Sequence, residues 1–265
     1  MKEFDLSGQV AFISGTSRGL GRRFARALAR AGADIVGTSR TLESLDQTKK
    51  EIESLGQKFL PVVLDVTNQA SIHNAVDTAL DKFGKLDILV ANAGCNRRKP
   101  SVEVTWEDWD FIVDTNLKGA FFLAQAVAQK AMIPANYGRI ITIGSFTCVA
   151  GFAGLAPYGA SRGGVKQMTM SLADDWGPHG ITVNCLAPGW FQTEQNQMLY
   201  EDDQWVEYIS ERICLGRPGE ETDMDGAIIF LASESSRYMT GQTLLIDGGI
   251  STGRCRAMPF SQMQK

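Results

Sequence analysis

The chain has 265 residues, of which 44% are hydrophobic and 21% charged, which is enough apolar material for one α/β unit with a large core. Its net charge of -4 and pI near 5.3 disfavour nucleic acid or an anionic membrane as a partner, and no apolar run approaches the roughly 18 residues that span a bilayer. Five scattered cysteines without C-x-x-C spacing and only two histidines argue against disulfides, a zinc site or a histidine-based triad, and the absence of a signal-peptide pattern predicts a cytoplasmic protein.

Seven short apolar runs alternate with helical patterns along the chain. The first run ends in a glycine, and the stretch 21–32 then places Phe24 and Leu28 on one helix face, with Gly32 at its end. Because the runs are continuously apolar and separated by helices, we expect a parallel sheet covered on both faces, with ligands beyond the carboxyl ends of its strands. The predicted fold is a single-domain, Rossmann-like, doubly wound α/β sheet over residues 1–265, with strands at 10–15, 34–39, 59–66, 86–94, 138–145, 180–189 and 241–249.

The sequence SGTSRGLG (14–21) joins the first strand to the first helix. Gly15, Gly19 and Gly21 allow a tight turn and a close approach of the backbone to a phosphate, which the N-terminus of the following helix attracts. A purely structural turn is the alternative, but the strand before the loop and the helix after it favour dinucleotide binding.

Further motifs follow in order along the chain. They are NAG at 92–94 after the fourth strand, Asn116 within a helix, Ser145 at the end of the fifth strand, Tyr158 in the next helix, PGWFQT at 188–193 and GQTLLIDGG at 241–249. Together with the glycine loop, which is spaced G-x-x-x-G-x-G, this set resembles the short-chain dehydrogenase/reductase family almost from end to end. The resemblance implies hydride transfer between a nicotinamide dinucleotide and an alcohol or ketone carbon.

The end of the second strand indicates which dinucleotide is bound. Members of this family that use NAD tend to carry an acidic residue there, where this chain has Ser39 followed by Arg40. An arginine binds a 2′-phosphate that a carboxylate would repel, and Arg18 adds a second cation, so NADP(H) is favoured over NAD(H). Solvated surface arginines are the alternative. The resemblance implies these cofactor-binding residues: Gly15, Ser17, Arg18, Gly19, Leu20, Gly21, Ser39, Arg40, Asp65, Val66, Asn92, Ala93, Gly94, Tyr158, Arg162, Pro188, Gly189 and Thr193.

The resemblance also implies a catalytic set of Asn116, Ser145, Tyr158 and Arg162. Tyr158 donates or accepts the proton, Ser145 hydrogen-bonds the reacting oxygen, and Asn116 positions a water relay. In this family a lysine four residues after the tyrosine binds the nicotinamide ribose and lowers the tyrosine pKa; Arg162 stands in its place here. An arginine keeps the charge but cannot release a proton near neutral pH, so we expect an active but slower enzyme.

Each of these side chains has a structural alternative when it is taken singly. Tyr158 could be a core aromatic, Ser145 a cap at a strand end, and Asn116 the site of a helix kink. Asp65, which the resemblance assigns to the adenine amino group, could be a carboxylate at a helix start. For Arg162 the alternative is a loss of function at this position.

Residues 95–100 continue the NAG motif into consecutive arginines. NAGCNRRKP, GFAGLAPYGAS and APGWFQTEQN resemble the gluconate 5-dehydrogenase-like subgroup of the family, whose substrates are sugar acids. A cation at the mouth of the site suits a carboxylate, and we assign Arg98, in preference to Arg97, to this role. The alternative is that the arginines face solvent or pair with Glu103 or Glu107. The predicted substrate-binding residues are Arg98, Ser145, Cys148 and Tyr158.

Residues 190–214 follow the sixth strand and are rich in aromatic and amide side chains. We expect them to form a lid over the substrate; a surface helical excursion is the alternative. The helical stretches 105–132 and 152–176 carry long apolar faces, which form tetramer interfaces in this family, so the resemblance implies a homotetramer.

The predicted function is that of an NADP(H)-dependent oxidoreductase acting on a secondary alcohol or ketone of a sugar acid such as gluconate or 5-ketogluconate, with no metal. A 3-oxoacyl carrier-protein reductase or a general carbonyl reductase is the alternative within this class. A dinucleotide-binding sensor or interaction protein with impaired catalysis is the alternative outside it.

Overall fold

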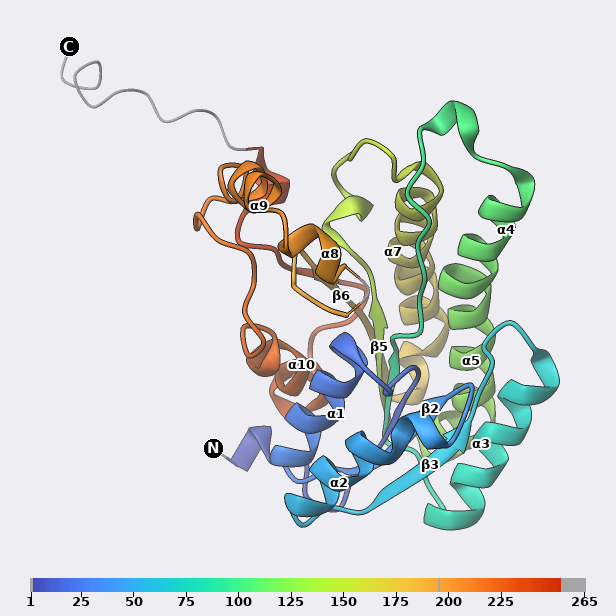
Figure 1. The fold of residues 1–265 in the computed structure, drawn as a ribbon. Helices are drawn as coiled ribbons and strands as arrows, with labels where there is room; N and C mark the ends of the chain where they lie inside the picture. The colour runs from blue at the N-terminus through green and yellow to red at the C-terminus, as the bar shows by residue number, and fades with distance from the viewer. Residues whose placement is uncertain (1, 195, 254–265) are drawn as a thin grey trace.

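Seven strands form one parallel sheet in the computed structural model, which describes residues 2–194 and 196–253 (Figure 1). Each of the seven predicted runs contains one strand, and the glycine-bearing ends of most runs lie in the loops that follow. The strand order is β3-β2-β1-β4-β5-β6-β7, so the predicted doubly wound α/β fold is confirmed. The strands are β1 (Val10–Ile13), β2 (Asp34–Ser39), β3 (Phe59–Val63), β4 (Ile88–Ala91), β5 (Gly138–Ile143), β6 (Ile181–Pro188) and β7 (Thr243–Ile246).

The chain builds the sheet in two directions from its first strand. It runs from β1 to β2 and β3, and then returns to place β4 on the other side of β1, where Ile13 lies beside Val90. The loops after β1 and β4 therefore leave the same edge of the sheet next to each other. Doubly wound sheets bind ligands at this reversal of strand order.

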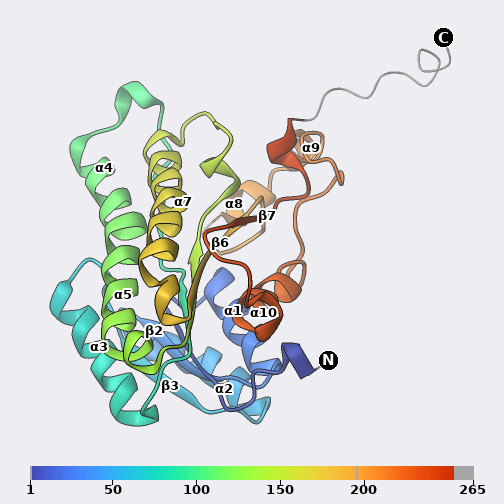
Figure 2. The ribbon, with the colours of Figure 1, turned by 180° about the vertical axis from the view of Figure 1, so that it is seen from behind.

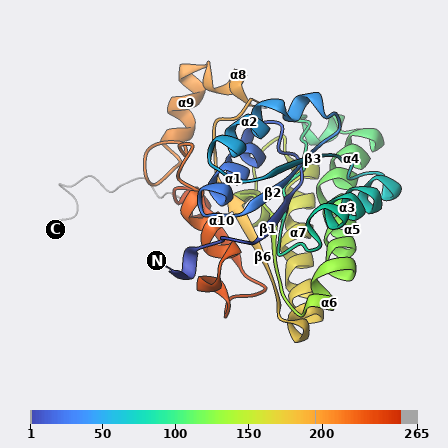
Figure 3. The ribbon, with the colours of Figure 1, turned by 90° about the horizontal axis from the view of Figure 1, so that it is seen from below.

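Helices cover both faces of the sheet, as the two opposite views show (Figures 1 and 2). The first layer packs α1 (Gly19–Arg30), α2 (Asp46–Ser54) and α10 (Asp225–Ala232) on one face. The second layer packs α3 (Gln69–Phe83), α5 (Gly119–Val127) and α7 (Ala156–Trp176) on the other face. The view from below separates the two layers (Figure 3). Because both faces are covered, every residue of β1, β4, β5 and β6 is buried, which explains their continuously apolar sequences.

The predicted helical stretch 105–132 is interrupted twice. The first interruption contains Asn116, which the sequence analysis placed in an ordinary helix. Such π turns are frequent at functional sites. The elements of this stretch are α4 (Trp106–Val113), a π turn (Asp114–Lys118), α5, a second π turn (Ala128–Met132) and α6 (Ile133–Ala135). Within the described part of the chain, no helix combines the length and apolarity that a membrane crossing requires.

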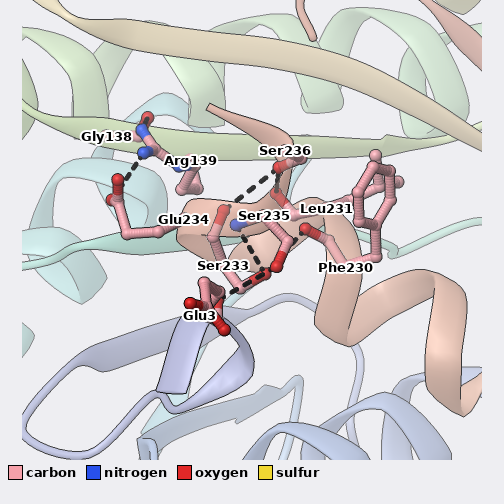
Figure 4. Close-up of polar contacts among 9 residues, drawn as sticks. All are labelled: Glu3, Gly138, Arg139, Phe230, Leu231, Ser233, Glu234, Ser235 and Ser236. Carbon is pink, nitrogen blue, oxygen red and sulfur yellow. Dashed lines mark hydrogen bonds and ion pairs between the residues drawn. The ribbon is translucent and has the colours of Figure 1, made fainter. Parts of the chain in front are cut away.

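A buried cation fixes the sheet at the edge opposite the motif-bearing loops (Figure 4). Arg139, 3% exposed near the start of β5, donates to Glu234 Oε1 at 2.7 Å and to Gly138 O at 3.0 Å. Glu234 follows α10, and the neighbouring Ser235 Oγ donates to Glu3 O at 3.3 Å. These bonds connect β5, α10 and the N-terminal residues, so the opposite edge is left to the candidate site.

Candidate active site

The glycine loop after β1 is bonded to the loop after β4. Asn92 Nδ2 donates to Ser14 O at 2.9 Å and to Gly15 O at 3.1 Å, while Ser14 Oγ accepts from the Asn92 and Ala93 amides, both at 2.9 Å. Gly15 has a φ of 74°, and a Cβ on Gly21 would lie 1.9 Å from Gly15 O, so both positions need glycine. The two predicted cofactor motifs therefore form one cradle.

Helix α1 begins at Gly19 with no side-chain cap and no acidic residue in its first turn. A helix start of this kind offers N–H donors and positive potential to an anion. The Gly19 N–H donates to Glu194 Oε2 at 3.0 Å, so the structure already places a carboxylate there. Of the remaining loop residues, Ser17 accepts from Arg22 at its carbonyl and Leu20 packs against the core.

The end of β2 has the cationic character that the sequence predicted. Ser39 Oγ accepts from Ser44 Oγ at 2.7 Å, and the Arg40 side chain that follows is exposed. Arg18 is also exposed, in extended backbone just before α1. In residues 2–194 and 196–253, neither arginine is in an ion pair, so both are available to an anion at this edge.

Asp65 lies at the turn between β3 and α3. Its Oδ1 accepts from Thr67 N at 2.9 Å and from Thr67 Oγ1 at 2.7 Å, which fits the structural alternative for this residue. Val66 is buried, and its carbonyl oxygen would lie 2.8 Å from a Cβ on Gly119. The assignment of Asp65 to the adenine amino group stays a prediction.

The Asn116 side chain connects the π turn with the loop after β4 and with α7. Its Oδ1 accepts from Cys95 N at 2.8 Å, and its Nδ2 donates to Cys95 O at 3.0 Å and to Ser161 Oγ at 3.1 Å. Ser161 Oγ in turn donates to Tyr158 O at 2.7 Å. Asn116 is fully buried, so it holds the backbone of the predicted site in place.

Tyr158 and Arg162 lie one turn apart on α7. The guanidinium carbon of Arg162 is 5.0 Å from the Tyr158 ring centroid, and Nη1 donates to Ile143 O at 2.7 Å. A Cβ on Gly94 would lie 2.4 Å from Nη2, so the guanidinium fills the space beside this glycine. Arg162 is 5% exposed, its Nε has no hydrogen-bond partner and no carboxylate pairs with it within the described ranges. A buried cation without a counter-charge is costly, and here it lies against the tyrosine ring.

Ser145 follows β5 and lies 6% exposed in the same region. Its Oγ accepts from Thr147 N at 3.2 Å, which caps the 3-10 turn Phe146–Cys148, and this turn packs against α7. The hydroxyl acts as an acceptor in this bond, so its proton remains for another partner. Burial raises the pKa of the Cys148 and Cys95 thiols, which suits the prediction that they line the site without acting as nucleophiles.

Arg97 and Lys99 share a carboxylate that the sequence analysis did not consider. Arg97 Nη1 lies 3.0 Å from Asp108 Oδ1, and Lys99 Nζ lies 2.5 Å from Asp108 Oδ2. The sequence alternative named Glu103 or Glu107 as the partner of the arginines. The structure assigns this contact to Asp108, whose place on the inner face of α4 was not evident from charge alone.

Arg98 faces away from that carboxylate. Its guanidinium carbon lies 5.5 Å from the Phe152 ring centroid and 5.6 Å from that of Trp190. Phe152 precedes α7 and Trp190 follows β6, so Arg98 lies between the two segments that flank the predicted substrate position. In the described residues, no ion pair involves Arg98.

Residues 190–214 include α8 (Gln197–Tyr200) and α9 (Asp203–Ser210), and residue 195 lies outside the described residues. Trp190 packs against Phe146, Phe152 and Trp205, with ring centroids 5.9, 5.4 and 5.0 Å apart. The segment therefore lies over the carboxyl ends of β5 and β6, next to the turn that Ser145 caps (Figure 1). This is the position that the predicted lid requires.

The PGWFQT motif begins this segment. Pro188 ends β6, Gly189 N donates to Ile246 O at 2.9 Å, and Thr193 N donates to Asn196 Oδ1 at 2.7 Å. Arg23 on α1 donates to Gln192 O at 2.8 Å. The motif is thus bound to β7 at one end and to the first turns of α1 at the other.

The described residues fit a dinucleotide along this edge of the sheet. The glycine cradle and the α1 N-terminus suit a pyrophosphate, the exposed Arg18 and Arg40 suit a further phosphate, and the unneutralised Arg162 suits a polar ring substituent.

Comparison with known proteins identifies the family. A family model described as enoyl-(acyl carrier protein) reductase matches residues 15–251. A short-chain type dehydrogenase/reductase from Mycobacterium marinum is 35% identical, with a TM-score of 0.88, covering 94% of this chain and 98% of that chain. A gluconate 5-dehydrogenase from Gluconobacter oxydans is 41% identical over 248 residues, covering 94% of this chain and 96% of that protein. This chain belongs to the short-chain dehydrogenase/reductase family.

A second gluconate 5-dehydrogenase is similar in structure as well as in sequence. It comes from Burkholderia cenocepacia J2315, was crystallised with NADP and tartrate, and is 38% identical with a TM-score of 0.91, covering 95% of this chain and 98% of that chain. The predicted family, its oxidoreductase class and the similarity to gluconate 5-dehydrogenases are confirmed. The cofactor of this short-chain dehydrogenase/reductase was predicted to be NADP(H), in agreement with the ligand of that relative.

Proposed function

We propose that the protein is an NADP(H)-dependent oxidoreductase that transfers a hydride between nicotinamide and a secondary alcohol or ketone of a sugar acid, with gluconate and 5-ketogluconate as the model pair. One observation carries the proposal: a buried, unneutralised Arg162 cation lies against the Tyr158 ring and Gly94, at the edge of the sheet where the cofactor motifs meet. The cytoplasmic location and the single-domain organisation stay predictions.

The cofactor residues act through backbone shape and charge. The bound nicotinamide gives or takes the hydride. The cradle around Gly15 and Asn92 holds the pyrophosphate at the start of α1, and Arg18 and Arg40 bind the 2′-phosphate. No carboxylate at the end of β2 repels that phosphate, because the strand ends in Ser39.

Replacing Arg40 with aspartate should lower kcat/KM for NADPH by about tenfold or more, because a charge-assisted phosphate contact is lost and a repulsive charge is added. Steady-state kinetics with NADPH and NADH measure the change. The exposed, remote Arg237→Asp is the control for the charge change and should leave the cofactor preference unchanged. Equal efficiency of the parent protein with the two cofactors would contradict the NADP(H) assignment.

The proton is handled by Tyr158. Its hydroxyl gives a proton to the ketone oxygen during reduction and takes one from the alcohol during oxidation. Ser145 donates a hydrogen bond to the same oxygen, and Arg162 stabilises the phenolate form of the tyrosine. Asn116 fixes the backbone around Cys95 and Ser161 and positions the water that exchanges protons with bulk solvent.

The substrate carboxylate binds to Arg98. This cation lies beside the aromatic pair Phe152 and Trp190, and burial lowers its pKa from the ordinary value. Its five N–H donors suit a carboxylate. The tartrate in the Burkholderia relative is a carboxylate ligand of comparable size to a sugar acid. Cys148, half-buried after Ser145, contacts the carbon chain.

Replacing Arg98 with alanine should raise KM for gluconate by about 10- to 100-fold, the value of one charge-assisted hydrogen-bonded pair, and spare a neutral ketone of similar size. Arg97→Ala is the matched control and should give a smaller rise, because Asp108 already binds this side chain. Equal losses on the acid and on the neutral ketone would assign Arg98 a structural role.

A substrate screen with purified protein and both cofactors tests the function itself. We expect the highest kcat/KM for the gluconate and 5-ketogluconate pair with NADP(H), followed by absorbance of the reduced nicotinamide. The highest value for a 3-oxoacyl thioester or a neutral ketone would select the carrier-protein reductase or the carbonyl reductase. NADPH binding without turnover of any substrate would select the sensor.

The homotetramer predicted from the sequence is proposed on the basis of exposed aromatic side chains. Trp106, Trp109, Phe111 and Phe122 on α4 and α5 are 82%, 41%, 40% and 39% exposed. Exposed apolar clusters of this kind mark protein interfaces. Sedimentation equilibrium measures the assembly mass against the 28.9 kDa of one chain.

A further inference from the structure

Asp108 is a buried carboxylate on α4 with both oxygens bonded. It is 3% exposed, and its Oδ1 accepts from Arg97 Nη1 at 3.0 Å. Its Oδ2 accepts from Lys99 Nζ at 2.5 Å and from Thr105 N at 3.2 Å. Lys99 and Arg97 hold the pKa of this carboxyl well below its usual range, so it is ionised at neutral pH.

The two bonded cations flank Arg98 in sequence. Side chains 97 and 99 point to Asp108, and Arg97 also stacks at 4.1 Å on the Phe111 ring. In an extended chain, successive side chains point to opposite sides, so the side chain between them is directed away from α4. That direction leads to Phe152 and Trp190, the rings that Arg98 covers.

The backbone beside Arg98 is fixed on the far side too. Lys99 N donates to Gly154 O at 3.2 Å. A Cβ on Gly154, where φ is +76°, would lie 3.0 Å from Arg98 Cγ, so the arginine stem packs directly on this glycine. Asp108 and Gly154 therefore hold residues 97–99 from two sides.

Without the Asp108 charge, three neighbouring cations would repel one another and all three would be free to bind one carboxylate. With it, two cations are neutralised and one remains. The choice among the three cations is then made by the position of a carboxylate on α4.

We propose that Asp108 is a positioning residue that sets substrate specificity: it binds Arg97 and Lys99 and thereby presents Arg98 alone to the substrate carboxylate. The inference rests on the proposed function, because it concerns the same sugar-acid site. Asp108 does not touch the substrate. Its effect passes through Arg98.

Calorimetric titration of the NADP-loaded protein with tartrate tests the inference, with KM for gluconate as the second readout. Asp108→Asn should raise both the tartrate Kd and the KM by about tenfold, the lower end of the value of a charge-assisted hydrogen bond. The NADPH Kd, the KM for a neutral ketone and kcat should change by less than about twofold. Asp110→Asn, the same charge change at an exposed position of α4, is the matched control.

A double-variant cycle separates positioning from general support of the fold. If Asp108 acts through Arg98, Asp108→Asn should add nothing to the loss already caused by Arg98→Ala. A further tenfold loss in that background would overturn the inference, as would an unchanged tartrate Kd in Asp108→Asn. Should Asp108→Asn unfold, Asp108→Glu, which keeps the charge, carries the same cycle with a smaller expected rise.

The parent protein distinguishes this inference from the proposed function. If it binds tartrate but oxidises no sugar acid, the proposed function fails and the variant cycle still decides the role of Asp108. If it binds neither tartrate nor gluconate, both fail, because no carboxylate then reaches Arg98.

Discussion

Replacing Tyr158 with phenylalanine should lower kcat by about 10²- to 10⁴-fold, the usual cost of losing a general acid, and leave the Kd of NADPH within about twofold. The change deletes only the hydroxyl. The ring that faces Arg162 remains, and so does the Tyr158 carbonyl that accepts from Ser161. Stopped-flow or steady-state turnover and NADPH fluorescence measure the two quantities separately.

Tyr238→Phe is the control for this substitution, because its side chain is fully exposed. It should match the parent protein in turnover and cofactor binding. Undiminished turnover in Tyr158→Phe would place proton transfer on another group and withdraw the proposed roles of Ser145 and Arg162 with it.

The pair Arg162→Lys and Arg162→Met should have opposite effects on kcat. Lysine keeps the positive charge, regains an exchangeable proton and is expected to raise kcat. Methionine removes the charge and should lower kcat by about 10²-fold, a loss of the size seen when proton transfer is impaired. A neighbouring cation favours the phenolate form, so without it the oxidation rate of the methionine variant should rise at higher pH than that of the parent.

Rates of alcohol oxidation across pH with NADP test this pair, and Arg237→Met serves as an exposed control. A methionine variant equal to the parent would leave Arg162 without a catalytic role. Turnover by the lysine variant alone would mean that the parent protein is a dinucleotide-binding protein without activity.

The sheet and the cofactor cradle follow from local sequence. Every residue of β1 is buried, so its run is apolar without alternation, and the sequence reveals this directly. Gly15 and Gly21 sit where a side chain would strain or collide with the backbone, so the loop is marked by its own composition. Such features depend on residues close together in the chain.

The missing parts of the site depend on contacts between distant residues. Asn116 looks like any helical residue in sequence; its π turn accompanies bonds to Cys95 and Ser161. Glu194 reaches Gly19 across 175 positions, which no periodicity records. Among the cations at 97–99, charge alone does not distinguish one from another, because the position of Asp108 decides which of them is neutralised.

The cover of the site leaves and rejoins the body of the protein at one point. Phe191 and Gly219 form a parallel bridge, Gly219 N donates to Trp190 O at 2.8 Å, and a Cβ on Gly219 would lie 2.3 Å from the Phe191 ring. Since the ends are joined, each doubling of the intervening length costs only about 0.6 kcal/mol in closure entropy. Insertions, deletions and wholesale sequence change between 191 and 219 thus leave the sheet and the dinucleotide cradle almost untouched. New substrate preferences can arise in evolution by replacing this one segment, while the cofactor and the hydride chemistry are inherited unchanged.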